Sequence, residues 1–197
     1  MQSAGSTFLA RLLGELGYDL GDNHYIENYH NEGQPYQIRG VQHVPLHNLL
    51  QKWERCADDV DLVDVLEVSK GLPEVVKNPF MARWLRVWLQ KGGARPQHVL
   101  VTIRDVQEQS RSNAAAWKRP ESALEAARSH LDLGVLLETL VVEDIPFTPI
   151  LYPLSVLDPD YLIDSIWTFL DLPTPQMYYK AHKKIADPTL VHSYMVE

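Results

Sequence analysis

The sequence predicts an α/β fold in three layers, with a central, mainly parallel sheet flanked by helices. Segments of strand character alternate with segments of helical spacing along most of the chain, which is typical of a parallel sheet. The clearest strand, "HVLVTIRD", is followed directly by the helical candidate "VQEQSRSNAAAWKR", which is the strand-then-helix unit of such a sheet. With 197 residues, 45% of them hydrophobic, the chain has the size and composition of one globular domain with one core.

The chain opens with small residues that lead directly into a helical pattern. In "MQSAGSTFLARLLGELG", apolar residues recur at helical spacing from Phe8 to Leu16, and Gly17 stands where a left-handed C-terminal cap is expected. The next segment, "DLGDNHYIENYHNEGQPYQIRG", has no periodicity and is rich in Asn, Gly, Tyr and His. We therefore expect a first helix and then a long loop, and long loops in compact domains are usually functional or mobile.

The middle of the chain predicts two helices and a short strand. Pro45 introduces a helix over "LHNLLQKWERC", whereas "DLVDVLEV" is compatible with either a strand or a helix. "EVVKNPF" is predicted to be a short buried strand that ends at Pro79. "MARWLRVWLQKGG" returns to helical spacing and stops at glycine, and its tryptophans Trp84 and Trp88 are expected in the core.

The last third predicts a helix, a strand and a second helix. "SALEAARSHLDLGVLLETLVVED" is long enough for an extended helix, and "PFTPILY" is predicted to be a strand. "DPDYLIDSIWTFLDL" is predicted to be a helix in which Asp158 is the N-cap and Pro159 occupies the first turn.

Composition and charge limit the classes of function. A net charge of −8 and a pI near 5.4 argue against a general nucleic-acid-binding or anionic-membrane-binding surface, so neither is expected as a partner. Cys56 is the only cysteine, which excludes an intrachain disulfide and a Cys-X-X-Cys pair. No apolar stretch approaches the roughly 18 residues of a membrane span, and no signal-peptide pattern is present. We expect a soluble protein of the reducing cytoplasm.

The opening residues Ser3, Ala4, Gly5, Ser6 and Thr7 are suited to binding an anion. A turn of small residues followed at once by a helix leaves backbone N–H groups unpaired, and the helix dipole adds partial positive charge there. The hydroxyls of the last two residues supply further donors. The alternative is an ordinary helix entry with Ser or Thr as N-cap. No lysine precedes the hydroxyl pair, so the loop departs from the G-x-x-x-x-G-K-[ST] pattern of kinases and ATPases.

Four stretches together resemble the P-loop-like sulfotransferases. "QSAGSTFLARLLGELG" resembles their first loop and helix, and "VLVTIRDVQEQSRS" resembles their second signature, in which Arg104 ends a strand and Ser112 follows eight positions later. "KNPF" is similar to the Lys-Asp-Pro segment of tyrosylprotein and bacterial members, and "IADPTLVHS" to a C-terminal segment of bacterial members. The resemblance covers nearly the whole chain and implies a P-loop-like domain.

The resemblance implies transfer of a sulfuryl group from 3′-phosphoadenosine-5′-phosphosulfate (PAPS) to a hydroxyl or amine. The first loop, Ser3 to Thr7, would bind the 5′-phosphosulfate, while Arg104 and Ser112 would hold the 3′-phosphate. An Arg fork and a hydroxyl form charge-assisted bonds that distinguish a 3′-phosphate from a free hydroxyl. The product would be 3′-phosphoadenosine-5′-phosphate (PAP), and the acceptor a small molecule, a glycan or a peptide.

The same resemblance implies two catalytic side chains and no metal. Lys77 would neutralise charge on the transferring sulfuryl group and on the departing phosphate. Family members place a general base shortly after the first helix, where Glu27 lies at about the right distance. The rivals in the same loop are His24, His30 and Glu32. A sulfuryl group carries less negative charge than a phosphoryl group, so no bound magnesium is required.

Some family features are absent from this sequence, and they keep two other functions open. The first loop has no basic residue, Val106 stands where proline usually follows Arg-Asp, and no strand precedes the first loop. We expect a single sulfotransferase-like domain over residues 1–197, and either this domain lacks the first strand or the true chain starts earlier. The main alternative is a non-catalytic relative that binds a nucleotide or a partner protein. A small-molecule kinase with a modified loop is less favoured.

Overall fold

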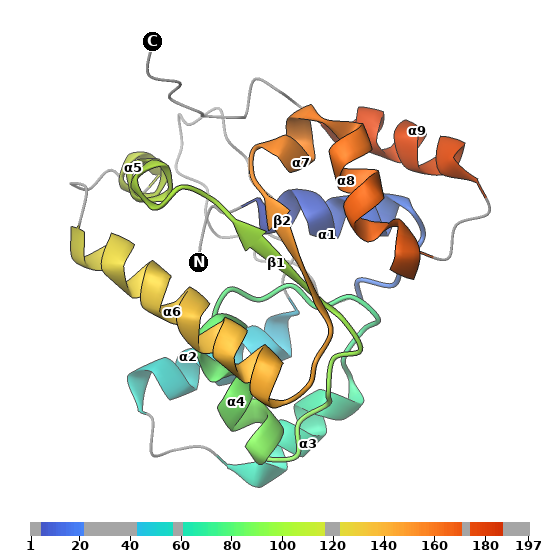
Figure 1. The fold of residues 1–197 in the computed structure, drawn as a ribbon. Helices are drawn as coiled ribbons and strands as arrows, with labels where there is room; N and C mark the ends of the chain where they lie inside the picture. The colour runs from blue at the N-terminus through green and yellow to red at the C-terminus, as the bar shows by residue number, and fades with distance from the viewer. Residues whose placement is uncertain (1–4, 22–42, 57–60, 117–122, 171–173, 187–197) are drawn as a thin grey trace.

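The computed structural model describes residues 5–21, 43–56, 61–116, 123–170 and 174–186, which form two strands and a larger number of helices (Figure 1). The elements in chain order are α1 (Ser6–Glu15), α2 (Val44–Arg55), α3 (Leu62–Lys70), α4 (Met81–Gln90), β1 (Val99–Ile103), α5 (Val106–Ala116), α6 (Ala123–Val142), β2 (Phe147–Leu151), α7 (Leu154–Leu157), α8 (Pro159–Ile166), the 3₁₀ turn η1 (Trp167–Phe169) and α9 (Pro175–Ile185).

The two strands form a parallel pair, in register from Val99 opposite Phe147 to Ile103 opposite Leu151. Parallel strands require a crossover, which here contains α5 and α6. Both strands therefore end at the same edge of the sheet. Arg104 follows β1 at that edge, and Tyr152 follows β2.

The core is divided into two clusters, one on each face of the strand pair. On one face, buried residues of α2, α3, α4 and α6 pack with Val101 of β1. On the other face, residues of α1, α8 and α9 pack with Ile150 of β2. Figure 1 shows the same division, with α2, α3, α4 and α6 on one side of the strands and α1, α7, α8 and α9 on the other. Alternating side chains of a buried strand supply both faces, which explains the largely apolar strand sequences.

Several predicted element boundaries are confirmed. Gly17 has φ +97° after α1, and the N–H of Tyr18 donates to the carbonyl of Leu13, so the helix ends at a glycine cap. Asp158 caps α8, because its side chain accepts from the backbone N–H groups of Asp160 and Tyr161. The ambiguous segment "DLVDVLEV" is helical and lies in α3.

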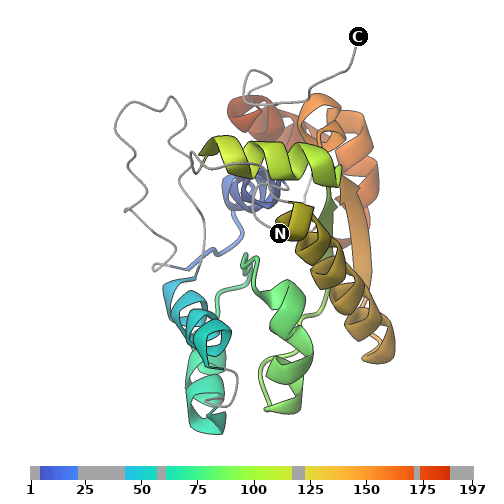
Figure 2. The same ribbon diagram turned by 90° about the vertical axis from the view of Figure 1, so that its left-hand side faces the viewer.

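The strand predicted over "EVVKNPF" is wrong. Residues 72–78 bend at residues 74–75 and enter no ladder, and residues 79–80 turn into α4. The N–H of Val75 donates to the carbonyl of Asp19 at 2.9 Å, so this backbone is tied to the segment after α1 instead of to a strand. An apolar run of this length indicates burial but does not determine a hydrogen-bond partner. Figure 2 shows residues 71–80 rising from α3 toward the level of α1 and then turning down into α4.

The coarse α/β prediction with a parallel sheet is confirmed for the described residues. Helices predominate, and the short helices α7 and α9 lie in segments for which the sequence pattern predicts no element. Across the described part of the chain, none of the helices combines the length and the apolar character that crossing a membrane requires.

Candidate functional site

Gly5 forms the entry of α1 in a conformation that favours glycine. It is the N-cap residue, with φ 86° and ψ −3°, and no side chain caps the helix. Its carbonyl accepts from the N–H of Phe8 at 3.0 Å, while no hydrogen bond within the described residues uses the N–H groups of Ser6 and Thr7. The alternative of a Ser or Thr N-cap is therefore wrong. The helix entry presents backbone donors and hydroxyls, as an anion site requires.

Tyr152 brings Gly5 and Arg104 together at the carboxyl edge of the sheet. A Cβ added at Gly5 would lie 2.6 Å from Cδ2 of Tyr152, so the glycine backbone packs directly against the ring. The guanidinium carbon of Arg104 lies 4.7 Å from the centroid of the same ring. Burial raises the pKa of the Tyr152 hydroxyl, and the charge of Arg104 opposes that rise. We call Gly5, Arg104, Glu108 and Tyr152 the Arg104 cluster.

The charge of Arg104 is compensated inside the protein. Its side chain is only 3% exposed, and its Nε lies 3.7 Å from a carboxylate oxygen of Glu108, one turn further along α5. Asp105 caps the start of α5, where its side chain accepts from the N–H of Glu108 at 2.9 Å. An anion that binds Arg104 therefore has to compete with the carboxylate of Glu108.

The structure describes the other predicted nucleotide-binding and catalytic residues only in part. Ser112 lies in α5, two turns after Arg104, but its side chain is outside the described part of the structure. Ser3 and Ala4 also lie outside the described residues, as does the predicted base Glu27 with its rivals His24, His30 and Glu32.

Lys77 lies in the 72–80 segment, and it forms no ion pair within the described residues. Its side chain is half-buried, and burial lowers the pKa of its ammonium group from 10.5 to about 8. No hydrogen bond or ion pair within the described residues joins Lys77 to Gly5 or Arg104. A lysine whose pKa is lowered by burial is a candidate for charge stabilisation, since perturbed pKa values occur often at functional sites.

His47, in the first turn of α2, lies against Phe80 of the segment that carries Lys77 and was not predicted from the sequence. The imidazole is 9% exposed, and its ring stacks on that of Phe80 with centroids 5.4 Å apart. Burial and then the charge of Lys77 lower the pKa of the imidazole. Its Nδ1 is buried and has no hydrogen-bond partner in the described structure, and the same is true of the side-chain nitrogen of Asn78. We call His47, Lys77, Asn78 and Phe80 the Lys77 cluster.

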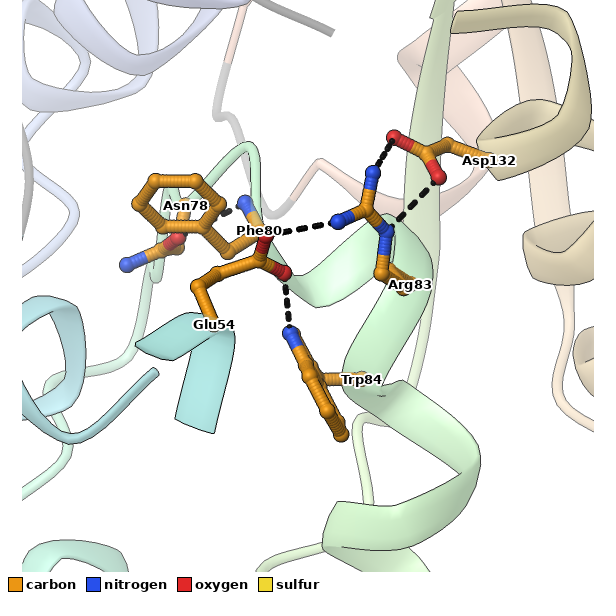
Figure 3. A network of polar contacts seen from close by, with 6 residues as sticks. All are labelled: Glu54, Asn78, Phe80, Arg83, Trp84 and Asp132. Atoms are coloured by element: carbon orange, nitrogen blue, oxygen red, sulfur yellow. Dashed lines mark hydrogen bonds and ion pairs between the residues drawn. The ribbon is translucent and has the colours of Figure 1, made fainter. Parts of the chain in front are cut away.

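A polar network fixes the start of α4 directly after Lys77 (Figure 3). The guanidinium of Arg83 binds both carboxylate oxygens of Asp132 on α6, at 2.9 and 3.0 Å. It also binds Glu54 of α2 at 2.6 Å, and Glu54 accepts from the indole of Trp84. The network joins α2, α4 and α6, so the turn that carries Lys77 enters a helix anchored on two sides.

The predicted residues thus fall into two clusters. Gly5 and Arg104 meet around Tyr152, whereas the segment of Lys77 contacts α2 through the stacking of Phe80 on His47. Tyr152 was missed by sequence reasoning, although its position directly after a strand, like that of Arg104, is a usable signal. His47 carries no such signal, because a lone histidine on a helix is usually structural. No group of three His, Cys, Asp or Glu side chains that could hold a metal occurs within the described residues.

Comparison of the chain with protein-family models, with curated proteins and with solved structures finds no match.

Proposed function

We propose that the protein is a PAPS-dependent sulfotransferase with a three-layer, P-loop-like fold. The observation that carries this proposal is the meeting of Gly5 and Arg104 at the carboxyl edge of a parallel strand pair. In open α/β sheets this edge is the usual place for ligands. Two segments almost 100 residues apart, each proposed for one end of the same nucleotide, approach the same tyrosine ring.

The two ends of the nucleotide would use different donors. The α1 entry offers the N–H groups and hydroxyls of Ser6 and Thr7 to the 5′-phosphosulfate, with Ser3 and Ala4 extending the loop. Arg104, together with Ser112 on α5, would hold the 3′-phosphate and displace Glu108. Each charge-assisted bond contributes about 1.5 to 3 kcal/mol, which lets a few donors bind an anion in an acidic protein.

The transfer itself would depend on position and charge. An acceptor oxygen or nitrogen attacks sulfur in line, and PAP leaves with the electron pair of the broken S–O bond. Lys77 would stabilise the charge that develops on the sulfuryl and phosphate oxygens. A cation of lowered pKa and without a carboxylate partner in the described structure is suited to this role, because no internal anion competes for it. Glu27 remains the predicted base from the resemblance.

Isothermal titration with PAP tests the nucleotide site. The expected result is binding by the wild type and at least a tenfold loss in Arg104→Ala, since one charge-assisted bond corresponds to more than 1.4 kcal/mol. Arg86→Ala is the matched control, because within the described residues Arg86 of α4 forms only an exposed pair, with Glu138 of α6. Absence of binding by the wild type, or equal binding by Arg104→Ala, would contradict the proposal. Tighter binding of ATP than of PAP would favour a kinase.

A further inference from the structure

We propose that His47 is the general base of the transfer reaction and takes the proton of the acceptor at Nδ1. The inference rests on the proposed function and gives the role of base, predicted for Glu27, to a residue that neither the motifs nor the resemblance selects. It is carried by a buried imidazole nitrogen that has no partner in the described structure, on a ring that stacks on Phe80, three residues after the lysine of the proposed sulfuryl site.

The other histidines that are buried or half-buried in the described structure are held by hydrogen bonds. The imidazole of His43 accepts from the N–H of Leu46 and caps α2. His98 pairs with the hydroxyl of Thr148, and His182 with the carbonyl of Ser155. His47 differs from all three, because its Nδ1 is buried and makes no hydrogen bond in the described structure. An unsatisfied buried polar atom carries a desolvation penalty, so an incoming hydroxyl or water that pairs with it is favoured.

The surroundings of His47 keep the imidazole neutral. Burial is the larger cause of its lowered pKa, and Lys77 is the one charged group that contributes to the shift within the described structure. A positive charge at Lys77 opposes protonation of the ring, so at neutral pH the ring is in its basic form. Lys77 thus carries the positive charge, and the imidazole of His47 carries the lone pair that accepts a proton.

Stacking on Phe80 and the backbone of α2 hold the ring in place. Phe80 stacks on it with an interplanar angle of 30°, and the N–H of Phe80 is held by the side-chain oxygen of Asn78 at 2.9 Å. The backbone of His47 belongs to α2, where its N–H donates to the carbonyl of His43 at 2.9 Å. The Arg83 network anchors α2 and α4 to one another through Glu54 (Figure 3). A base on two anchored helices is positioned more precisely than one on a loop.

The proposed step balances without another reactant. As the acceptor O–H attacks sulfur, a new S–O bond forms and the S–O bond to the 5′-phosphate breaks with its electron pair on PAP. The acceptor proton moves to Nδ1 of His47 and is later released to water. With water as acceptor, the same step yields inorganic sulfate, so the base is testable before the natural acceptor is known.

The experiment measures sulfate release from labelled PAPS into water, together with PAP affinity by calorimetry. For His47→Gln we expect about a hundredfold slower release, the usual contribution of a general base, with PAP affinity unchanged within twofold. The matched control is His98→Gln, whose histidine is also partly buried but precedes β1 at the opposite edge of the sheet. Its rate should equal that of the wild type. Glu27→Gln tests the rival base in the same assay.

Two further readouts separate a base from a structural residue. The wild-type rate should rise with pH through a value below 6.5, and His47→Gln should lose this rising limb. Added imidazole should restore part of the rate of His47→Gly and none in Glu27→Gln. A normal rate in His47→Gln with normal PAP binding overturns the inference and leaves the sulfotransferase proposal intact. A wild type that binds PAP without releasing sulfate also overturns it, and one that does not bind PAP contradicts both proposals.

Discussion

The Arg104 cluster and the Lys77 cluster differ in whether the cation has a carboxylate partner within the described residues. Arg104 lies against an aromatic ring and a carboxylate, and it is nearly fully buried. Lys77 has no carboxylate partner in the described structure, and the polar atoms beside it, Nδ1 of His47 and the amide nitrogen of Asn78, are unsatisfied. The first arrangement gives its cation a carboxylate partner, whereas the second gives its cation none within the described residues.

In the proposed function, the Arg104 cluster binds the nucleotide and the Lys77 cluster stabilises charge during the transfer. A guanidinium with a constant charge and a fixed ring beneath it can hold a phosphate in one orientation. A lysine with a lowered pKa can respond to charge that develops during a reaction, and its burial costs folding free energy. The two clusters should therefore respond in opposite directions when their central residues are replaced. Disturbing the first should destabilise the protein, and neutralising the second should stabilise it.

The largest effect is expected at Gly5. Alanine at this position would require a positive φ and would place its Cβ 2.6 Å from Tyr152, so we expect a loss of about 3 kcal/mol in the free energy of unfolding. Gly17→Ala is the matched control, because its φ is also positive but no atom lies within 4 Å. That variant should lose only about 1 kcal/mol. Urea denaturation of both compares them, and equal losses would show that Tyr152 does not constrain the α1 entry.

Lys77→Met should raise the stability at pH 7 by about 2 kcal/mol. The shift from 10.5 to about 8 corresponds to roughly 3 kcal/mol at 1.36 kcal/mol per pKa unit, reduced because the side chain is only half-buried. The folded pKa lies below the unfolded one, so the unfolded state binds more protons between about pH 8 and 10.5. Wild-type stability should therefore rise in that window relative to the variant.

The measurement is the urea midpoint of wild type and Lys77→Met from pH 7 to pH 10.5. The two curves should converge as the lysine loses its charge in the unfolded state. A constant difference across this range would contradict the lowered pKa, and with it the view that the Lys77 cluster lacks a compensating anion.

A smaller effect is expected from the network that anchors α4. Arg83→Gln removes the paired hydrogen bonds to Asp132, whose side chain is 17% exposed, and should cost about 1 to 2 kcal/mol. Arg86→Gln on the same helix removes an exposed pair with Glu138 at 3.8 Å and should cost less than about 0.5 kcal/mol. Denaturation midpoints of the two variants provide the comparison. If Arg83→Gln loses no more stability than Arg86→Gln, the turn at Lys77 does not depend on this network.

The sequence was most informative where a local rule decides the structure. The cap at Asp158, the glycine stop at Gly17 and the strand ending before Arg104 each follow from side-chain chemistry within a few residues. The segment around Val75 was predicted as a strand, because its apolar pattern reports burial while its hydrogen-bond partner, Asp19, lies more than 50 residues away. Long-range pairing is not encoded in a short pattern.

The same distinction between local rules and long-range contacts applies to the candidate site. Gly5 and Arg104 were predicted as one site from two motifs, and their common contact with Tyr152 follows from the parallel register of β1 and β2. His47 could not be predicted, since its role depends on which side chains of another segment reach it. Only the packing of α2 against Phe80 distinguishes this histidine from one whose nitrogens are already paired.

The smallest expected effect concerns how the Arg104 cluster admits an anion. Glu108→Gln removes a carboxylate that lies 3.7 Å from the guanidinium and keeps the size of the side chain. With less competition and less repulsion, PAP should bind about two- to fivefold more tightly, a change of about 0.4 to 1 kcal/mol. The gain should shrink as salt is raised toward 1 M, where charges are screened within about 3 Å. Calorimetry at low and high salt measures it. Weaker PAP binding in Glu108→Gln would mean that the carboxylate orients Arg104 instead of competing with the phosphate.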